Sequence, residues 1–371
     1  MRGKVRLGKR TKELAPLLEA KEIAVICHRD LDAIGAAGLI DAKAGAVINA
    51  SSSLTCRFPN LGPRLLFEQG ILHLDCAGRH LFEILEDGDI IEIEGRKIIH
   101  KGEVIAVGRV VTGHLVAERK KFSDLNLPAE LDRFVANTLC YAQKEKRALL
   151  GKLIFPALDI KFQDKTVVVV VRGLGYKEDL QILTPFIQEA KPILMGVDGG
   201  ADALLGFGYT PHLIVGDMDS VSDAALKSGA VLVAHAYQSG ECPSAERLLR
   251  LGLNFHPVSI PGTSEDLGLL LAHDQGASLI VLVGSHSHMI DFLEKGRRGM
   301  ASTFLTRLKI GPILLDAKKV SELYRAGTSW SVAAVVLAAL IPILVFIGLA
   351  SPWKHYFRLL WLQLRLIVGW R

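Results

Sequence analysis

The chain has 371 residues and a formal net charge of +5, with 50% hydrophobic and 22% charged residues. This length exceeds what one hydrophobic core usually serves, so we expect two domains joined by a helical connector. The positive charge is concentrated in residues 1–12 and 353–371. That distribution argues against a basic nucleic-acid groove across the body, and it favours attraction of the ends to anionic lipid headgroups.

The basic N-terminus is not followed by a secretory signal, because Glu13, Glu19 and Glu22 interrupt the stretch where an apolar core would stand. The five cysteines are scattered, odd in number and without a CxxC pair. This usage is typical of reduced cytosolic thiols rather than of a disulfide framework or a zinc site. We therefore predict that the soluble domains are cytoplasmic.

Residues 1–115 are predicted to form a strand-rich α/β domain, because short apolar runs alternate there with glycines. The runs are Ile23–Cys27, Ala46–Ile48, Ile71–Leu74, Asp89–Ile93, Lys97–His100 and Val104–Val111. Two polar strings, His28–Asp32 and Arg57–Arg64, stand between them. They form either a second polar site or structural caps, with Asp30 or Asp32 capping a helix that begins near Ala33.

Residues 116–160 are predicted to form a helical connector. Between Leu125 and Leu150, apolar residues recur at helical spacing among charged ones. The pattern indicates a connecting or dimerising helix, and we expect a homodimer.

Residues 161–328 are predicted to form a Rossmann-like open α/β domain with a parallel sheet. Apolar runs of strand length are bounded by glycines and followed by helix signals, as in a sheet covered on both faces. The runs are Val167–Val171, Ile193–Val197, Leu213–Val215, Val231–Ala234, Val258–Ile260, Leu279–Val283 and Ile313–Leu315. Ligands bind beyond the carboxyl ends of such strands, so the residues that follow each run are the site candidates.

Residues 330–352 are predicted to be a transmembrane helix. No charged residue occurs in this range, and the nineteen residues Val332–Ala350 would rise about 28 Å as a helix, close to the thickness of the bilayer core. Pro342 is compatible with a membrane helix. A buried core helix is the alternative. We predict a single-pass protein of the cell membrane.

Residues 353–371 are predicted to form a basic amphipathic tail. At 100° per residue, Lys354, Arg358 and Arg365 fall within about 40° of one another, which is typical of an interfacial helix. A single crossing places this tail outside the cell, whereas the positive-inside rule favours the cytoplasmic face. Either the tail lies on the far surface, or the apolar segment returns as a hairpin.

Two neighbouring strand ends carry acidic, glycine-rich strings, Asp198–Asp202 and Gly216–Ser220. Asp198, Asp217 and Asp219 can converge there, and they are candidate Mg²⁺ ligands and, if the protein is an enzyme, catalytic residues. The adjacent glycines let backbone N–H groups approach a phosphate. The alternative is that Asp198 and Asp217 only cap helices or form turns.

Two further strand ends carry basic side chains. Arg172, beside Gly173 at the end of the first strand, offers a forked donor to phosphate. His286 and His288 follow the run that ends at Val283, and they either contact phosphate or transfer protons, or belong to a surface loop. Arg297 and Arg298 either belong to a solvated helix end or reach the ligand crevice.

The string Val197–Val221 resembles the nucleotide-binding core of thiamin pyrophosphokinases, whose aspartates bind Mg²⁺ and ATP phosphates. The whole chain resembles more closely the SteA-like family, which is described as cytokinetic-ring or membrane-anchored proteins with a thiamin-pyrophosphokinase-like domain. The supporting stretches are His28–Asp32, Cys56–Pro63, Arg172–Leu180, Gly299–Gly311 and the terminal apolar span. The resemblance implies Mg²⁺ with a nucleotide or pyrophosphate-containing ligand, bound by Arg172, Gly173, Gly199, Gly200, Asp202, Ser220, Thr263, Glu265, Asp266 and His286.

The chain departs from the kinase pattern at two strings and at its end. Gly262–Asp266 keeps an acidic pair with one altered position, and Gly284–His288 stands where the kinases carry an arginine–aspartate–histidine string. The β-sandwich that helps form the thiamin pocket is replaced by the apolar segment. The sequence therefore does not favour thiamin as the substrate.

These features support a membrane-anchored protein that binds a nucleotide or pyrophosphate and acts as a scaffold or regulator in bacterial cell division or cell-envelope assembly. The division role is implied only by the resemblance. Expected partners are a nucleotide-like ligand, membrane lipids, a second copy of the chain and a protein of a membrane or division complex, without nucleic acid. The alternatives are an active Mg²⁺-dependent diphosphokinase that converts ATP to AMP, and a purely structural dimer without a ligand.

Overall fold

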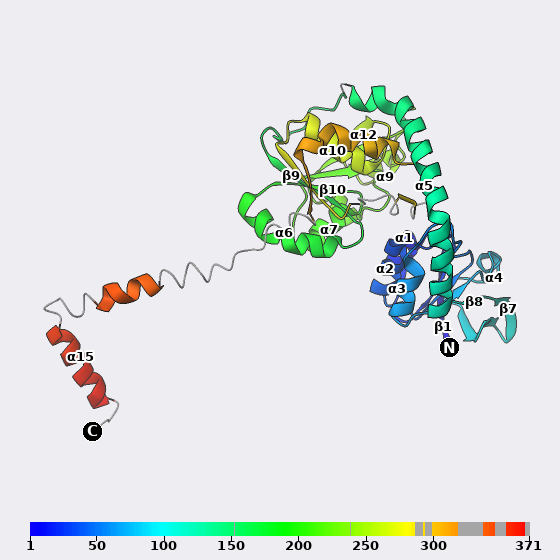
Figure 1. Cartoon of the computed structure of the whole chain (residues 1–371), viewed down its shortest axis with the longest axis horizontal. Coiled ribbons are helices and arrows are strands. Elements are labelled where there is room, and N and C mark those ends of the chain that lie inside the picture. The colour runs from blue at the N-terminus through cyan, green and yellow to red at the C-terminus, as the bar shows by residue number, and fades with distance from the viewer. Residues whose placement is uncertain are drawn as a thin grey trace. The chain divides into compact units, whose positions relative to one another are not determined.

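The computed structural model describes residues 1–151, 153–237, 239–285, 292–293, 299–317, 337–345 and 354–367. The chain divides into two compact units, Met1–Val320 and Ser321–Arg371, and each is considered by itself. The first unit contains two β-sheets and a long helix (Figure 1). The predicted domain boundaries stay predictions.

The first sheet has eight strands in the order β7-β6-β5-β1-β2-β3-β4-β8. Its strands are β1 (Arg2–Gly8), β2 (Ile23–Ile26), β3 (Ala46–Asn49), β4 (Leu72–Asp75), β5 (Ile90–Glu94), β6 (Lys97–His100), β7 (Glu103–Val107) and β8 (Arg109–Val110). Strands β1 to β4 are parallel, whereas β5 to β7 and β8 join antiparallel to their neighbours. The mixed α/β character expected for this region is therefore present.

Helices cover one face of this sheet (Figure 1). They are α1 (Thr11–Leu14), the 3₁₀ helix η1 (Ala15–Leu17), α2 (Ala33–Asp41) and α3 (Gly62–Glu68). Leu14, Leu39 and Leu66 from these helices pack on Ile26 and Val47 of the strands. The other face packs on α4 (Leu81–Ile84) and on side chains of the antiparallel strands.

The basic N-terminal residues lie within the sheet rather than forming a separate arm. Strand β1 pairs with β2 and with β5, and Val5 is fully buried. Arg6 donates to the buried Glu22 carboxylate at 3.1 Å. The sequence did not predict β1 because basic residues alternate with its apolar ones. The acidic partners of these basic side chains, such as Glu22, lie elsewhere in the chain and are brought close only by folding.

Helix α5 (Gly113–Leu150) connects the two sheets; it begins three residues before the predicted connector 116–160 and ends ten residues before the end of that range. The Thr112 hydroxyl accepts from the Leu115 backbone N–H at 3.3 Å and caps the helix. On one side, Arg57 pairs with Glu130 at 3.1 Å. On the other, α5 packs along α12 (Ala301–Ile310).

The second sheet has seven strands, all parallel, in the order β13-β12-β11-β10-β9-β14-β15. They are β9 (Thr166–Val171), β10 (Ile193–Val197), β11 (Leu213–Gly216), β12 (Val231–Ala236), β13 (His256–Ser259), β14 (Leu279–Val283) and β15 (Leu314–Asp316). Every predicted run lies on one of these strands, with ends shifted by at most two residues. The parallel α/β expectation is therefore confirmed.

Both faces of this sheet are covered by helices (Figure 1). They are α6 (Tyr176–Ala190), α7 (Gly200–Gly206), α8 (Asp223–Leu226), α9 (Ala245–Arg250), α10 (Ser264–Asp274), α12 and the 3₁₀ helix η2 (Gly311–Ile313). Strand β9 shows the two-sided burial directly: Val167 and Val169 pack with α10 and α12, whereas Val168 and Val170 pack with α6 and α7. A run of consecutive valines therefore suits a central strand with two buried faces.

In the second unit, residues 337–345 are helical, and α15 spans Lys354–Ile367. All of their described side chains are exposed. Among the described residues, none of the helices combines the length and the apolar character needed to cross a bilayer. The predicted segment 330–352 lies outside the described residues except for 337–345.

Candidate functional site

The carboxyl ends of β9 to β13 open into a hollow of about 720 Å³. This edge is where open α/β sheets bind their ligands. Its lining includes Glu145, Asp198, Asp217, Asp219, Thr263 and Glu265. Five of these six side chains carry a carboxylate, so the hollow is acidic.

The turn between β10 and α7 restricts which residue types can occupy its positions, because of its backbone conformation and its close contacts. Asp198 adopts a φ of +47°, which few residues other than glycine, asparagine and aspartate tolerate. A Cβ on Gly200 would collide with the Val170 carbonyl group. A Cβ on Gly216, which has a φ of +140°, would collide with the Asp198 carboxylate. The glycines therefore bring the backbone of three strands close around Asp198.

Asp198 is half-buried, and one of its carboxylate oxygens is shielded from solvent. Burial, and next the neighbouring Asp217 carboxylate, raise the pKa of Asp198 to about 7. Hydrogen bonds from Ser264 and from the backbone of Met218 and Asp217 oppose this shift. Among the described residues, its Oδ1 atom has no hydrogen-bond partner. A cation in the hollow would satisfy both the charge and this free oxygen.

Asp217 and Asp219 are held by a tight turn that an arginine stabilises from outside. The Asp219 backbone N–H donates to Asp217 Oδ1 at 3.1 Å, and Met218 between them is buried with a φ of +61°. Arg247 of α9 donates to the Met218 carbonyl oxygen at 2.7 Å and to the Val221 carbonyl oxygen at 2.8 Å. The guanidinium thus fixes the backbone that carries both aspartates.

The Thr263–Asp266 segment forms a capping box at the start of α10. Asp266 Oδ2 accepts from the Thr263 backbone N–H at 2.9 Å and from its hydroxyl at 3.0 Å. Asp266 is fully buried and does not line the hollow. Of the predicted acidic pair, Glu265 faces the hollow, and its carboxylate lies 3.6 Å from the Arg307 guanidinium.

Several other predicted ligand residues lie outside the lining of the hollow. Asp202 accepts from the Ser222 backbone N–H at 3.1 Å and so holds the following loop. Ser220 is exposed, and Gly173 is buried in a turn whose N–H donates to the Val171 carbonyl oxygen. Arg172 is exposed and passes beside Gly199.

Four predicted candidates cannot be placed. His286, His288, Arg297 and Arg298 lie outside the described residues. Their roles stay predictions.

Sequence reasoning missed Glu145, Ser302 and Thr303, which line the hollow from α5 and α12. Burial, and then the Asp266 carboxylate, raise the pKa of Glu145. Nothing in its helical context distinguishes Glu145 from the solvated acids around it. The two hydroxyls follow Met300 at the start of a helix, a position that often caps helices but does not by itself indicate a ligand.

The carboxylates of the hollow suit a metal ion whose remaining coordination positions are filled by a bound ligand. Among the described residues, no three carboxylate, imidazole or thiolate groups lie close enough together to hold a metal by themselves. Mg²⁺ typically takes one or two carboxylates and fills its other positions with water and phosphate oxygens. Asp198, with its free buried oxygen, and Asp217 match that requirement, with Asp219 as a further oxygen donor at the rim.

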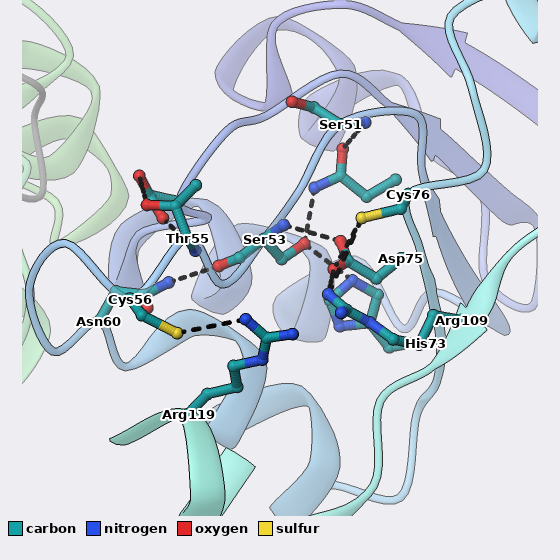
Figure 2. Close-up of polar contacts among 12 residues, drawn as sticks. Ser51, Ser53, Thr55, Cys56, Asn60, His73, Asp75, Cys76, Arg109 and Arg119 are labelled. Carbon is teal, nitrogen blue, oxygen red and sulfur yellow. Dashed lines mark hydrogen bonds and ion pairs between the residues drawn. The ribbon is translucent and has the colours of Figure 1, made fainter. Parts of the chain in front are cut away.

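A second polar network lies at the carboxyl ends of β3 and β4 (Figure 2). The Ser53 backbone N–H donates to Asp75 Oδ1 at 2.7 Å, and the Ser53 hydroxyl lies 3.1 Å from His73 Nε2. Arg109 donates to Asp75 Oδ2 at 2.8 Å. Burial lowers the pKa of His73 to about 4, so this imidazole is neutral at pH 7. Since Ser53, His73 and Asp75 are all buried, the network holds the loop after β3 in place.

The polar string after β2 has the capping role that was one of its two predicted roles. Asp30 accepts from the Thr55 backbone N–H and hydroxyl, both at 2.8 Å. Asp32 caps α2 by accepting from the Gly35 N–H at 2.6 Å. Both carboxylates are therefore used in local structure.

Comparison with known proteins gives two partial similarities. Residues 318–368 match the family model of the SteA-like C-terminal domain. A solved structure of thiamine pyrophosphokinase from Bacillus subtilis is 22% identical over 36% of this chain and 54% of that chain, with a TM-score of 0.23. The chain thus spans about half the length of that structure. No curated protein matches the chain.

Proposed function

We propose that the chain is a membrane-anchored protein that binds a nucleotide or another pyrophosphate-bearing ligand, together with Mg²⁺, in the acidic hollow. One observation carries this proposal: beside Asp217, at the carboxyl edge of a parallel sheet, the half-buried Asp198 has a buried Oδ1 atom with no hydrogen-bond partner among the described residues. Such a group is costly to bury unless a cation or proton neutralises it. A polyphosphate bridged by Mg²⁺ provides the cation and fills its remaining coordination positions.

The size and lining of the hollow support a nucleotide-sized ligand. A volume of about 720 Å³ lies within the range of small-molecule and cofactor sites. Thr263 and Ser264, at the start of α10, line one edge of the hollow. Tyr237 and Pro261 add apolar surface. A base or similar ring can pack on that surface while its phosphates face the aspartates.

The membrane part of the proposal rests on the second unit and on the sequence of the apolar segment. Described side chains of residues 337–345 and α15 are exposed, and many are large and apolar. We further propose a role as a scaffold or regulator in bacterial cell division or envelope assembly, which is the role implied by the resemblance of the sequence to the SteA-like family; residues 318–368 match the SteA-like C-terminal domain. We place the soluble domains in the cytoplasm and expect a protein partner at the membrane.

The same acidic hollow also fits an active diphosphokinase. In that reaction, an acceptor hydroxyl oxygen attacks the β-phosphorus of ATP, the bond to the α-phosphate oxygen breaks, and AMP leaves. Asp198 and Asp217 would hold the Mg²⁺ in this reaction rather than act as a base, because a bound cation lowers the pKa of a carboxylate. Mg²⁺ would neutralise the phosphate charge as it develops.

Isothermal titration of the full chain with ATP, ADP and CDP in the presence of Mg²⁺ tests the binding site. We expect binding of at least one of them, lost in Asp217→Ala and in Asp219→Ala. Asp132→Ala removes an exposed carboxylate on α5 and should leave binding unchanged. Failure of all three nucleotides to bind the wild-type chain, or unchanged binding in Asp217→Ala, would reject the proposal.

Formation of AMP separates the two functions. Purified protein with ATP, Mg²⁺ and either thiamin or a metabolite extract should release AMP only if it is a diphosphokinase. If the protein binds a nucleotide but releases no AMP, the diphosphokinase function is excluded and the binding function is retained.

A further inference from the structure

We propose that the first sheet carries a second ligand site, which binds a small phosphate-bearing organic anion without a metal ion. The site is a hollow of about 470 Å³ at the carboxyl ends of β1 and β2. Carboxyl ends of adjacent parallel strands are where ligands bind in open α/β sheets. This site is separate from the acidic hollow and does not depend on the function proposed for it.

The lining of this second hollow is basic. Among the described residues of the lining, Lys9, Arg10, Lys12 and Arg172 are opposed by a single carboxylate, Asp32. The Asp32 carboxylate already accepts from the Gly35 N–H at 2.6 Å. Its five charged groups therefore leave a clear positive excess, the opposite of the acidic hollow.

The four basic side chains differ in whether they already make an ion pair or a contact with an aromatic ring. Lys9 Nζ lies 5.8 Å from the centre of the Phe82 ring, and Arg10 pairs with Glu13 at 2.9 Å. Lys12 and Arg172 make no ion pair in the described part of the chain. These two cations are therefore the ones that an anion can recruit without breaking an existing contact.

His28 adds an oriented hydrogen-bonding group. Its Nδ1 atom lies 2.9 Å from the hydroxyl of Thr11, which is 3% exposed. The His28 backbone is fixed as well, because its N–H and carbonyl oxygen bond to the Asn49 side chain at 3.0 and 2.6 Å. If the Thr11 hydroxyl donates to Nδ1, Nε2 carries the proton and can donate to a phosphate oxygen.

The remaining lining is small or apolar. Ala15, Ile34, Gly35 and Gly38 form this part of the wall. A ligand that is only an inorganic ion would leave this surface unused, whereas an organic anion with a ring would cover it. A volume of about 470 Å³ is within the usual range for such ligands. The chemistry therefore fits a phosphate ester of nucleotide size.

Alkylation of Cys27 tests the site, because this half-buried thiol lines the hollow. Full-length protein would be treated with iodoacetamide in EDTA, with and without AMP, and each cysteine would be followed by mass spectrometry. We expect AMP to slow alkylation of Cys27 several-fold. Alkylation of Cys140, which is exposed on α5, should not change.

Equilibrium dialysis of labelled AMP in EDTA gives a second measurement that does not depend on thiol reactivity. We expect binding by the wild-type chain and by Asp217→Ala, and at least a tenfold loss in Lys12→Glu and in His28→Ala. Lys121→Glu, a charge reversal at an exposed position of α5, is the matched control and should bind normally.

Three results would overturn the second site. They are absence of AMP binding in EDTA, binding that Lys12→Glu leaves unchanged, and binding that disappears in Asp217→Ala. The last result would assign the ligand to the acidic hollow and leave the function proposed there intact. Conversely, loss of Mg²⁺-nucleotide binding at the acidic hollow would not affect AMP binding in EDTA.

Discussion

Asp198 makes the stability of the folded chain depend on pH. Its pKa is raised to about 7 in the folded state, above the value of about 3.9 expected in an unfolded chain. The folded protein therefore holds this proton to higher pH than the unfolded chain does. Its contribution to stability is fully present below about pH 4 and is lost as pH rises to about 7, at up to about 1.4 kcal/mol per pH unit.

Asp198→Asn should remove this dependence, and asparagine also tolerates the positive φ at this position. We expect the variant, in the absence of ligand, to be more stable than the wild type at pH 8, with the difference vanishing near pH 4. Urea unfolding across this pH range measures the effect. Asp132→Asn should track the wild type throughout, and a pH-independent difference for Asp198→Asn would contradict the assignment.

Gly200 has a steric role that a matched glycine in the same helix does not share. A Cβ on Gly200 would collide with the Val170 carbonyl group, whereas a Cβ on Gly206 would have no described atom within 4 Å. We expect Gly200→Ala to lower the free energy of unfolding by about 2–4 kcal/mol and to disturb the turn at Asp198. Gly206→Ala should be neutral or raise it by up to about 1 kcal/mol. Equal effects of the two substitutions would refute the steric argument.

At the level of single residues, the sequence predicted carboxylates after strands that border the hollow but could not assign their contacts. Asp198, Asp217 and Glu265 line the hollow, whereas Asp266 caps a helix. An acidic residue in the first turn of a helix suits both roles, so spacing cannot separate them. Glu145 reaches the site from a distant helix, and that approach is decided only by tertiary packing.

Helix α15 presents a broad apolar surface and a narrow basic stripe. Leu359, Leu362 and Leu366 fall on one arc, and Leu366 is 82% exposed. Arg358 and Arg365 lie together on another arc, and the Arg365 guanidinium is 5.3 Å from the centre of the Trp361 ring. An exposed helix of this kind, with only positive charges, suits the interface of an anionic membrane.

Full-length protein in vesicles should therefore place Trp361 at the lipid interface. With Trp330, Trp353 and Trp370 replaced by phenylalanine, brominated lipids should quench Trp361, more strongly in anionic than in zwitterionic vesicles. The double variant Arg358→Glu and Arg365→Glu should lose that preference, while Lys227→Glu in the first unit should keep it. Emission from Trp361 typical of water in both kinds of vesicle would argue against an interfacial helix.

Among the elements, those with continuous apolar runs were predicted from sequence and those with mixed patterns were not. Strands β10 and β14 were predicted to the residue, because both of their faces are buried. Strand β1 was missed, since Arg2, Lys4 and Arg6 alternate with its apolar residues. The predicted connector 116–160 contains most of α5, but it extends beyond the end of the helix at Leu150.

At the scale of the whole molecule, the two sheets carry hollows of opposite charge. The acidic hollow gathers aspartate and glutamate side chains, whereas the basic hollow gathers lysine and arginine side chains. The composition could not predict this difference in charge between the two hollows. The charged residues of each hollow are far apart in the chain and meet only at the strand ends. The net charge of +5 therefore describes neither site.

Self-association is predicted through the exposed apolar side of α5. Leu125, Val135, Leu139 and Leu150 are all exposed and fall within about 80° of one another around the helix axis. Leu125 is 76% exposed. A stripe of this kind on a 38-residue helix suits pairing with a second copy, because each leucine can then bury its side chain against its counterpart.

The double variant Leu125→Glu and Leu139→Glu should convert the dimer to a monomer, since it places two charges in the contact at a cost of several kcal/mol. Light scattering of the full-length protein in detergent, corrected for bound detergent, gives the mass. Leu249→Glu changes an equally exposed leucine on α9 and should leave the dimer intact. A wild-type monomer, or a dimer that persists in the double variant, would exclude this face of α5 as the interface.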